Sequence, residues 1–215
     1  MKERPILMNA EMVRAILDGR KTQTRRPIKA QPPDCGYILA TCISTTGDRR
    51  NEGKHHWVKL ATDGRRVIDG KQPYFSCPFG QRGDHLWVRE TFFDAGPFLH
   101  APLFYEKPRF YYRADDAEIG CHRWTPSIHM PRHAARIILE VTAARVERVQ
   151  DITEAAAKAE GVPPAWLDVN GKDVNAHAAP TFRQGFARTM REIYGWGLWE
   201  MNMWVWVVEF KRVQP

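Results

Sequence analysis

The chain has 215 residues, enough for one domain with a sizeable core or for a small domain enlarged by insertions. Hydrophobic residues make up 43% and charged residues 27%, a balance that is typical of a folded globular protein and excludes a disordered one. The formal net charge of +7 favours a polyanionic partner such as RNA or DNA, with a merely soluble basic protein as the alternative.

The N-terminal segment RPILMN predicts a short strand, and Asn9 is a suitable N-cap for the helix that follows it. Apolar residues recur at helical spacing at positions 12, 13, 16 and 17, and Gly19 is typical of a helix C-terminus. The cationic stretch GRKTQTRR, residues 19–26, is therefore the exit from the first helix.

The four cysteines form no CxxC pair, and charges interrupt the N-terminal segment where a signal peptide would be apolar. No apolar run approaches the roughly 20 residues that span a bilayer. We therefore expect a cytoplasmic protein with free thiols and no membrane role.

Three segments have the composition of insertions, at about 31–77, 93–135 and 162–180. The first predicts an inserted hairpin or a long loop, because it is rich in Pro, Gly, Asp, Thr and Lys. Between the insertions, GQRGDHLWVRETFF predicts a glycine-rich turn followed by a strand, and RFYYRADD predicts a second strand. ARIILEVTAARVERV predicts a long strand whose later part could bend into another.

Toward the C-terminus, Asp151 and Glu154 form a D-x-x-E capping pattern for a short helix, ITEAAAKAE, that ends at Gly161. A third helix is predicted from Thr181, with an apolar stripe facing the core: Phe182, Phe186, Met190, Ile193 and Tyr194. MWVWVVEFKRV predicts the last strand. Because strands and helices do not alternate regularly, the sequence predicts a single α+β domain with a small curved or closed sheet.

The stretch after the first helix concentrates reactive groups at Lys21, Thr22 and Thr24. A threonine hydroxyl needs a base to take its proton, and a lysine is such a base only when burial or neighbouring cations depress its pKa. Lys21 and Thr24 would point to opposite faces of a regular strand, so their cooperation requires a turn or bulge. A solvated basic turn is the alternative.

Glu160 lies in the last turn of its helix, where the helix dipole disfavours an anion. We therefore expect a cationic partner, and Lys158 is already placed to pair with Glu154 at i, i+4. A solvated glutamate is the alternative.

Residues 124–133 place Trp124, His129, Arg132 and His133 within ten positions, which would allow a base to stack and a phosphate to bind. The alternative is a structural turn. Pro131 argues against a helix that would present both histidines to a metal, so we predict no metal site.

The ordered set GRKTQTRR, GQRGDHLWVRE, DITEAAAKAEG and WVWVVEF resembles the ASCH domain family, whose fold is a PUA-like β-barrel. The resemblance covers residues 5–30, 78–92, 136–161 and 200–213. The longer form of this chain, including RWTPSIHMPRHAARI, looks like the phage and prophage branch of the family. It implies a small barrel with flanking short helices and long loop insertions.

Small bacterial members of that family are amidohydrolases that remove the acetyl group from N4-acetylcytidine with a Lys, a Thr and a Glu. The resemblance places these roles on Lys21 as general base, Thr24 as nucleophile and Glu160 as the partner of the lysine. It implies no cofactor and a modified pyrimidine nucleoside, nucleotide or RNA as the partner. We expect further substrate contacts from Arg20, Thr22, Arg26, Gly83, Asp84, Arg89, Trp124, His129 and Arg132.

Two other functions are compatible with the same sequence. Some family members are discussed as RNA-binding or RNA-cleaving modules, so the cleft could serve RNA or DNA binding without catalysis. A metal-independent ribonuclease that uses His129 or His133 is the third hypothesis. The oligomeric state is left open.

Overall fold

A computed structural model of the chain describes residues 1–33, 37–42, 52–61, 63–67, 73–96, 108–120, 122–166 and 179–213. The chain divides into two compact units, one formed by Met1–Pro27 and Phe79–Pro215 and the other by Ile28–Pro78. The fold is α+β, with a mixed sheet and few helices. The segment predicted as an insertion at 31–77 thus belongs to a unit of its own.

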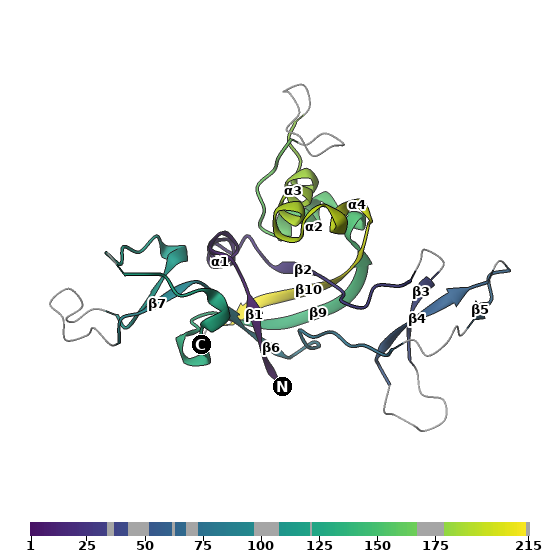
Figure 1. Ribbon diagram of the computed structural model, residues 1–215, viewed down its shortest axis with the longest axis horizontal. Helices are drawn as coiled ribbons and strands as arrows, with labels where there is room; N and C mark the ends of the chain where they lie inside the picture. The colour runs from purple at the N-terminus through teal and green to yellow at the C-terminus, as the bar shows by residue number, and fades with distance from the viewer. Residues whose placement is uncertain are drawn as a thin grey trace. The chain divides into compact units, whose positions relative to one another are not determined.

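The main sheet belongs to the first unit and has the strand order β1-β6-β9-β10-β2 (Figure 1). Its strands are β1 (Glu3–Leu7), β6 (His85–Arg89), β9 (Ile138–Arg148), β10 (Trp204–Val213) and β2 (Gln23–Pro27). β1 and β6 pair in parallel and the other neighbours are antiparallel. Within the described residues no pairing joins β1 to β2, so the expected closure into a barrel is not seen.

The long sequence predicted as one or two strands forms a single strand, β9. Its pairing with β10 shifts register between Glu209 and Phe210. A bulge of this kind bends a strand and increases its twist. The bend that the sequence suggested is therefore accommodated inside one continuous strand.

Helix α1 (Ala10–Leu17) begins as predicted, with the Asn9 side chain accepting a hydrogen bond of 2.8 Å from the amide of Met12. Helix α2 (Glu154–Ala159) differs from the prediction, because its N-cap is Thr153 and not Asp151. The Glu154 carboxylate instead accepts the amides of residues 182 and 183, at 2.9 and 3.1 Å, and so caps the next helix.

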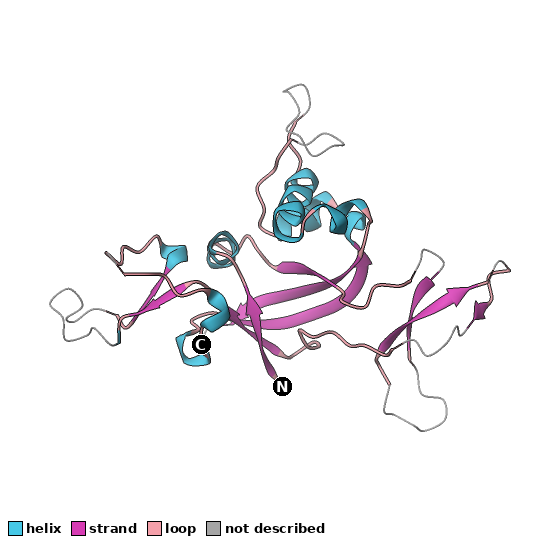
Figure 2. Cartoon of the chain, in the orientation of Figure 1, coloured by secondary structure: helices cyan, strands magenta, loops and turns pink. Residues whose placement is uncertain are grey.

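Helix α3 (Phe182–Tyr194) begins at its predicted cap, Thr181, and is followed by α4 (Trp196–Glu200), which the sequence did not suggest. Together with α2 these helices cover one face of the sheet, as Figure 2 also shows. The core on this face consists of Val149, Ile152, Ala157, Phe186, Met190, Leu198, Val205 and Val207. Ile193, predicted to face the core, is 40% exposed.

Within its described residues, the segment 93–135 contributes the end of β7 (Phe92–Asp94), which pairs with β8 (Phe110–Tyr112), and short 3-10 turns at Arg113–Asp115, Ser127–His129 and Arg132–Ala134. A buried carboxylate, that of Glu90, helps to hold this segment on the main sheet. It accepts two hydrogen bonds from Arg136, at 2.9 and 3.0 Å. Arg136 in turn contacts Asp115 at 2.6 Å. This ion-pair network ties the inserted segment to the end of β6.

The second unit contains an antiparallel sheet of β3 (Tyr37–Thr41), β4 (His55–Leu60) and β5 (Arg66–Val67). Its buried side chains include Tyr37, Trp57 and Val58. The Trp57 indole donates a hydrogen bond of 2.6 Å to the carbonyl of Ala30. The predicted hairpin is thus present as β3 and β4, with β5 added at its edge.

No helix in the described part of the chain combines the length and the apolar character needed to cross a membrane. Cys42 carries a free thiol. The expectation for Cys35 and Cys121 falls outside the described residues.

We predict that Phe186→Ala lowers the free energy of unfolding by about 3–5 kcal/mol, because it removes a fully buried ring from the core beneath α3. Ile193→Ala, on the exposed side of the same helix, should change it by less than about 1 kcal/mol. Urea unfolding followed by circular dichroism measures both values, and similar losses would contradict the packing described for α3.

Candidate active site

Lys21 and Glu160 are 139 positions apart in the sequence and meet inside the first unit. The Lys21 amine donates to the Glu160 carboxylate, with Nζ and Oε2 3.0 Å apart, and to the Glu160 backbone carbonyl at 2.8 Å. Their backbones form an isolated antiparallel bridge. Both side chains are almost completely buried, at 1% and 3% exposure.

The local sequence explains this meeting. The Lys21 amide donates to the carbonyl of Ala15 at the end of α1, and the Thr22 amide donates to the carbonyl of Ala159 at the end of α2. The chain that leaves the first helix is therefore hydrogen-bonded to two helix ends before β2 begins. The cationic partner expected for Glu160 is supplied from this exit segment.

A second cation, Arg25, reaches the same carboxylate. Its Nη1 donates to Glu160 Oε1 at 3.1 Å, and its Nη2 donates to Glu147 Oε2 at 2.9 Å. The guanidinium is 1% exposed and lies 5.8 Å from the centre of the Phe186 ring. Arg25 was not among the predicted site residues.

Burial lowers the pKa of Lys21 below its ordinary value of 10.5, because the charged amine loses its hydration. The Glu160 carboxylate opposes this effect, and the positive charges of Arg26 and Arg25 add to it. A lysine with a depressed pKa has the property that a general base requires. The sequence analysis required burial or neighbouring cations to lower the pKa of Lys21. Both act here, and burial is the larger cause.

Thr24 is buried, but the strand directs it away from Lys21 and Glu160. β2 pairs regularly with β10, with Thr24 opposite Val208 and no bulge between residues 23 and 27. The Gln23 side chain donates to a carbonyl of α2, and the Arg25 side chain donates to Glu160 at the end of that helix. Both therefore lie on the α2 side of the sheet, and Thr24 between them points to the other face. Within the described residues no hydrogen bond joins the Thr24 hydroxyl to the Lys21 amine.

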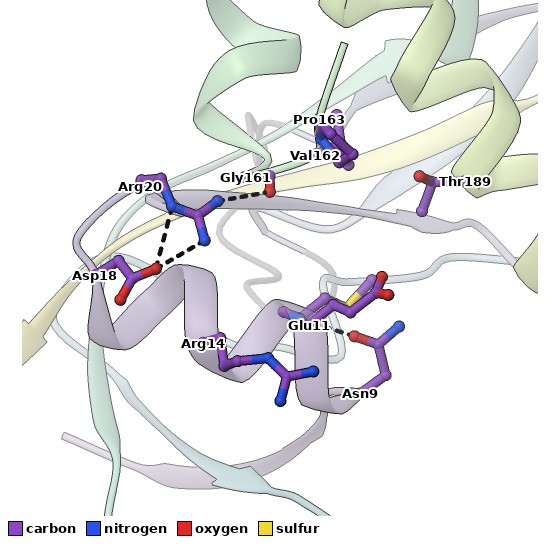
Figure 3. A pocket seen from close by; sticks show the side chains of 10 residues that line it. Asn9, Glu11, Arg14, Asp18, Arg20, Gly161, Val162, Pro163 and Thr189 are labelled. Atoms are coloured by element: carbon purple, nitrogen blue, oxygen red, sulfur yellow. Dashed lines mark hydrogen bonds and ion pairs between the residues drawn. The ribbon is translucent and has the colours of Figure 1, made fainter. Parts of the chain in front are cut away.

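A cavity of about 340 Å³ lies beside this cluster, between α1 and the segment that leaves α2. Its lining includes Arg14 and Asp18 on the α1 side, Gly161 and Pro163 after α2, and Thr189 on α3 (Figure 3). The predicted catalytic residues 21, 24 and 160 do not line it. The volume is within the usual range of small-molecule sites.

Gly161 separates the cavity from Lys21. Its φ angle is +76°, and a Cβ added there would lie 2.7 Å from the Cβ of Ala15 and 2.9 Å from the Cβ of Lys21. The backbone of residue 161 thus packs directly on the lysine, so the amine lies behind the wall of the cavity.

Of the predicted contacts near the first helix, only Arg20 lines the cavity. It pairs with Asp18 at 2.8 Å and donates to the Gly161 carbonyl at 3.2 Å, as Figure 3 shows. The Thr22 side chain is exposed. Arg26 donates to the carbonyl of Leu7 and to the Tyr194 hydroxyl, which places it in a structural role at the edge of the sheet.

The predicted contacts near the glycine-rich turn are held by the protein itself. The Gly83 and Asp84 amides donate to the carbonyls of Val141 and Gln81, both at 2.9 Å, and are occupied. Hydrogen bonds from the amides of Lys2 and Gln81 lower the pKa of Asp84, so its carboxylate fixes the N-terminus to this turn. Arg89 donates to the carbonyl of Ile128 and lies over Trp87.

The residues of the inserted segment that were predicted to contact a nucleobase or a phosphate are not part of the cavity lining. Trp124 packs against a small cluster that contains Phe93 and Ile119. His129 is exposed at the end of a 3-10 turn, and Arg132 forms an ion pair with Glu3, at 2.8 Å. Within the described residues, no group of three or more His, Cys, Asp or Glu side chains is arranged to hold a metal ion.

Comparison of the chain with protein-family models, with curated proteins and with solved structures found no match.

Sequence reasoning counted Arg25 among the cations that could depress the pKa of Lys21 but did not include it, or Gly161, among the site residues. Arg25 belongs to a block of cations that is typical of a solvated surface, and its alternation with Lys21 and Gln23 was the signal that could have placed it. Gly161 was recognised as a helix stop, but its contact with Lys21 depends on tertiary packing.

We predict that Gly161→Ala destabilises the protein more than Gly19→Ala. Both positions have a positive φ, +76° and +72°, which costs an alanine about 1 kcal/mol, but only Gly161 has close neighbours. The clash with Ala15 and Lys21 should add about 1–3 kcal/mol. Urea unfolding of the two variants measures the difference, and equal losses would show that Gly161 does not pack on Lys21.

Proposed function

We propose that this chain is a hydrolase that cleaves the amide of an N4-acylated cytidine-type nucleoside or nucleotide, with Lys21 and Glu160 as its acid–base pair. The observation that carries the proposal is the contact of 3.0 Å between the Lys21 amine and the Glu160 carboxylate. The resemblance to ASCH amidohydrolases assigns the same two residues to catalysis. The PUA-like barrel and a cytoplasmic location belong to this proposal as well.

In the proposed reaction the neutral Lys21 amine takes a proton from the nucleophile as it attacks the acyl carbon. The carbon–N4 bond then breaks, and the lysine ammonium gives its proton to the departing exocyclic nitrogen. When the nucleophile is a side-chain hydroxyl, water then gives a hydroxyl to the acyl group and a proton back to that oxygen; when the nucleophile is water, this step is not needed. The products are the carboxylic acid and the unmodified cytidine, and Glu160 stabilises the ammonium between the two transfers.

The resemblance assigns the nucleophile to Thr24. Because β2 directs Thr24 to the other face of the sheet, a water molecule activated by Lys21 is the alternative nucleophile. Thr24→Val distinguishes the two. It should abolish hydrolysis if the Thr24 hydroxyl is the nucleophile, and it should leave hydrolysis in place if water is the nucleophile.

The cavity beside α1 is the entry that we propose for the substrate, because its lining includes Gly161, which follows Glu160 directly and packs on Lys21. Gly161 lies between the cavity and the acid–base pair. Reaction therefore requires the segment at 161–163 to move when substrate binds, which is a common way for enzymes to complete a site and exclude water.

A noncatalytic RNA-binding or DNA-binding module is the second candidate. It is favoured by the burial of residues 21 and 160, which a structural ion pair would explain as well, and by the formal net charge of +7.

We predict that the purified protein releases acetate and cytidine from N4-acetylcytidine, and that Lys21→Arg loses this activity by about 10²–10⁴-fold. The guanidinium keeps the positive charge but does not act as a base at neutral pH. Lys211→Arg is the matched control, because Lys211 forms a surface ion pair with Glu140, and it should retain full turnover. Product formation is followed by chromatography.

The same samples separate the rival functions. Absence of turnover with N4-acetylcytidine and its 5′-monophosphate, together with salt-sensitive binding of RNA or DNA, would replace the hydrolase by a binding module. Cleavage of RNA without metal, lost in His129→Ala, would instead indicate a ribonuclease.

We predict that the rate of hydrolysis at low substrate concentration rises with pH and levels off below pH 10.5. The reason is that Lys21 must be neutral to act as a base, and burial lowers its pKa below 10.5. In Glu160→Gln the rising limb should move to lower pH, because the anion that stabilises the ammonium is removed. A rate that does not rise with pH anywhere below 10.5 would contradict the role of Lys21.

A further inference from the structure

Arg25 is a buried cation that the reaction described above does not use. It is on β2, where its side chain and that of Gln23 reach the α2 side of the sheet that also holds Lys21 and Glu160. Its guanidinium is 1% exposed. A buried arginine at this depth must be paired, and its two partners define what it can do.

The Glu160 carboxylate is divided between two cations. Oε2 accepts from the Lys21 amine at 3.0 Å, and Oε1 accepts from Arg25 Nη1 at 3.1 Å. A carboxylate bound through one oxygen only could rotate about its terminal bond. Binding through both oxygens fixes its plane and keeps Oε2 on the lysine.

Arg25 is itself held from the opposite side. Its Nη2 donates to Glu147 Oε2 at 2.9 Å, and the guanidinium lies near the Phe186 ring. A planar guanidinium can bridge two carboxylates in fixed directions, whereas a lysine ammonium is a single point of charge on a flexible chain. The residue type at position 25 therefore suits a bridge.

The bridge continues to the surface. Glu147 also accepts from Arg145 at 2.5 Å, and Arg145 contacts Glu209. Cations and anions alternate along this row, which consists of Lys21, Glu160, Arg25, Glu147, Arg145 and Glu209. Each buried charge is thus compensated, and the anion at Glu147 offsets part of the positive charge that Arg25 brings near the lysine.

We propose that Arg25 is a positioning residue of the Lys21–Glu160 pair, which directs one oxygen of the Glu160 carboxylate to the lysine amine and sets the charge around that amine together with Glu147. A role of Arg25 in catalysis rests on the proposed hydrolase function, whereas its effect on the Lys21 amine does not. In the proposed reaction, Arg25 contacts neither the substrate nor the reacting atoms.

The charged groups that act on Lys21 are Glu160 at the end of α2 and Arg25 and Arg26 in β2. Glu160 raises the pKa of Lys21, whereas Arg26 and Arg25 lower it. Removing Arg25 should therefore raise this pKa, because a cation is lost and the carboxylate charge acts on the lysine alone. Removing the charge of Glu147 should lower it, because Arg25 is then less compensated.

The test is the titration of the Lys21 amine by NMR in protein with ¹³C at the lysine ε carbons, with the signal assigned by its loss in Lys21→Arg. Arg25→Met should move the midpoint up by about one pH unit, and Glu147→Gln should move it down by a few tenths. Arg25→Lys, which keeps the charge but not the bridge, should lie between the wild type and Arg25→Met. Arg188→Met, which removes an exposed arginine paired with Glu192, is the matched control and should leave the midpoint unchanged.

Opposite shifts in Arg25→Met and Glu147→Gln support the proposal, since a purely structural role would give no such pattern. Unchanged midpoints, or shifts in the same direction, overturn it. If Arg25→Met does not fold, Glu147→Gln decides alone: a lower midpoint supports the proposal and any other result overturns it.

Activity separates this inference from the proposed function. If the wild type releases acetate, the rising limb of its pH–rate profile should move with the NMR midpoint in each variant. If no acetate is released, the hydrolase proposal fails, while the opposite shifts in the titration still establish the positioning role of Arg25.

Discussion

The compensation of one buried carboxylate organises this part of the fold. Glu160 lies at the C-terminus of α2, where the helix dipole disfavours a negative charge, and it is removed from water. Both costs are offset only because Lys21 and Arg25 reach it from the segment that follows α1. The ion pairs therefore hold the exit of the first helix against the end of the second, across 139 positions of sequence.

The same contacts that stabilise the fold would have to serve catalysis. A lysine that is desolvated and beside a carboxylate is drawn in two directions, since burial favours the neutral amine and Glu160 favours the ammonium. That balance suits a group that takes and returns a proton in one cycle. The pair lies in a closed site, because Gly161 separates Lys21 from the adjacent cavity, and the proposed reaction would require that backbone to move.

The sequence specifies the local features of this fold well. Asn9 and Thr181 begin their helices as expected, because the residue type and the following apolar spacing are sufficient signals. The need of Glu160 for a cation also follows from its place in the helix. Asp151 was wrongly taken as the cap of α2, since Thr153 gives an equally good local signal and tertiary packing assigns Glu154 to α3.

What the sequence does not specify is which face of a strand a side chain uses and which distant element meets it. The parallel pair of β1 and β6, the exposure of Ile193 and the burial of Arg25 all depend on pairing between distant segments. For the same reason the proposed role of Thr24 is the least supported by the geometry, because the regular pairing of β2 turns it from Lys21.

A double-mutant cycle on Lys21 and Glu160 tests the central claim most directly, with the free energies of unfolding of Lys21→Met, Glu160→Gln and the double variant measured in urea at neutral pH. If the two charges stabilise one another inside the protein, the coupling energy should be about 1.5 kcal/mol or more. A coupling below about 0.5 kcal/mol would mean that the two residues act independently. The buried pair would then be neither the organising contact of the fold nor a basis for acid–base chemistry.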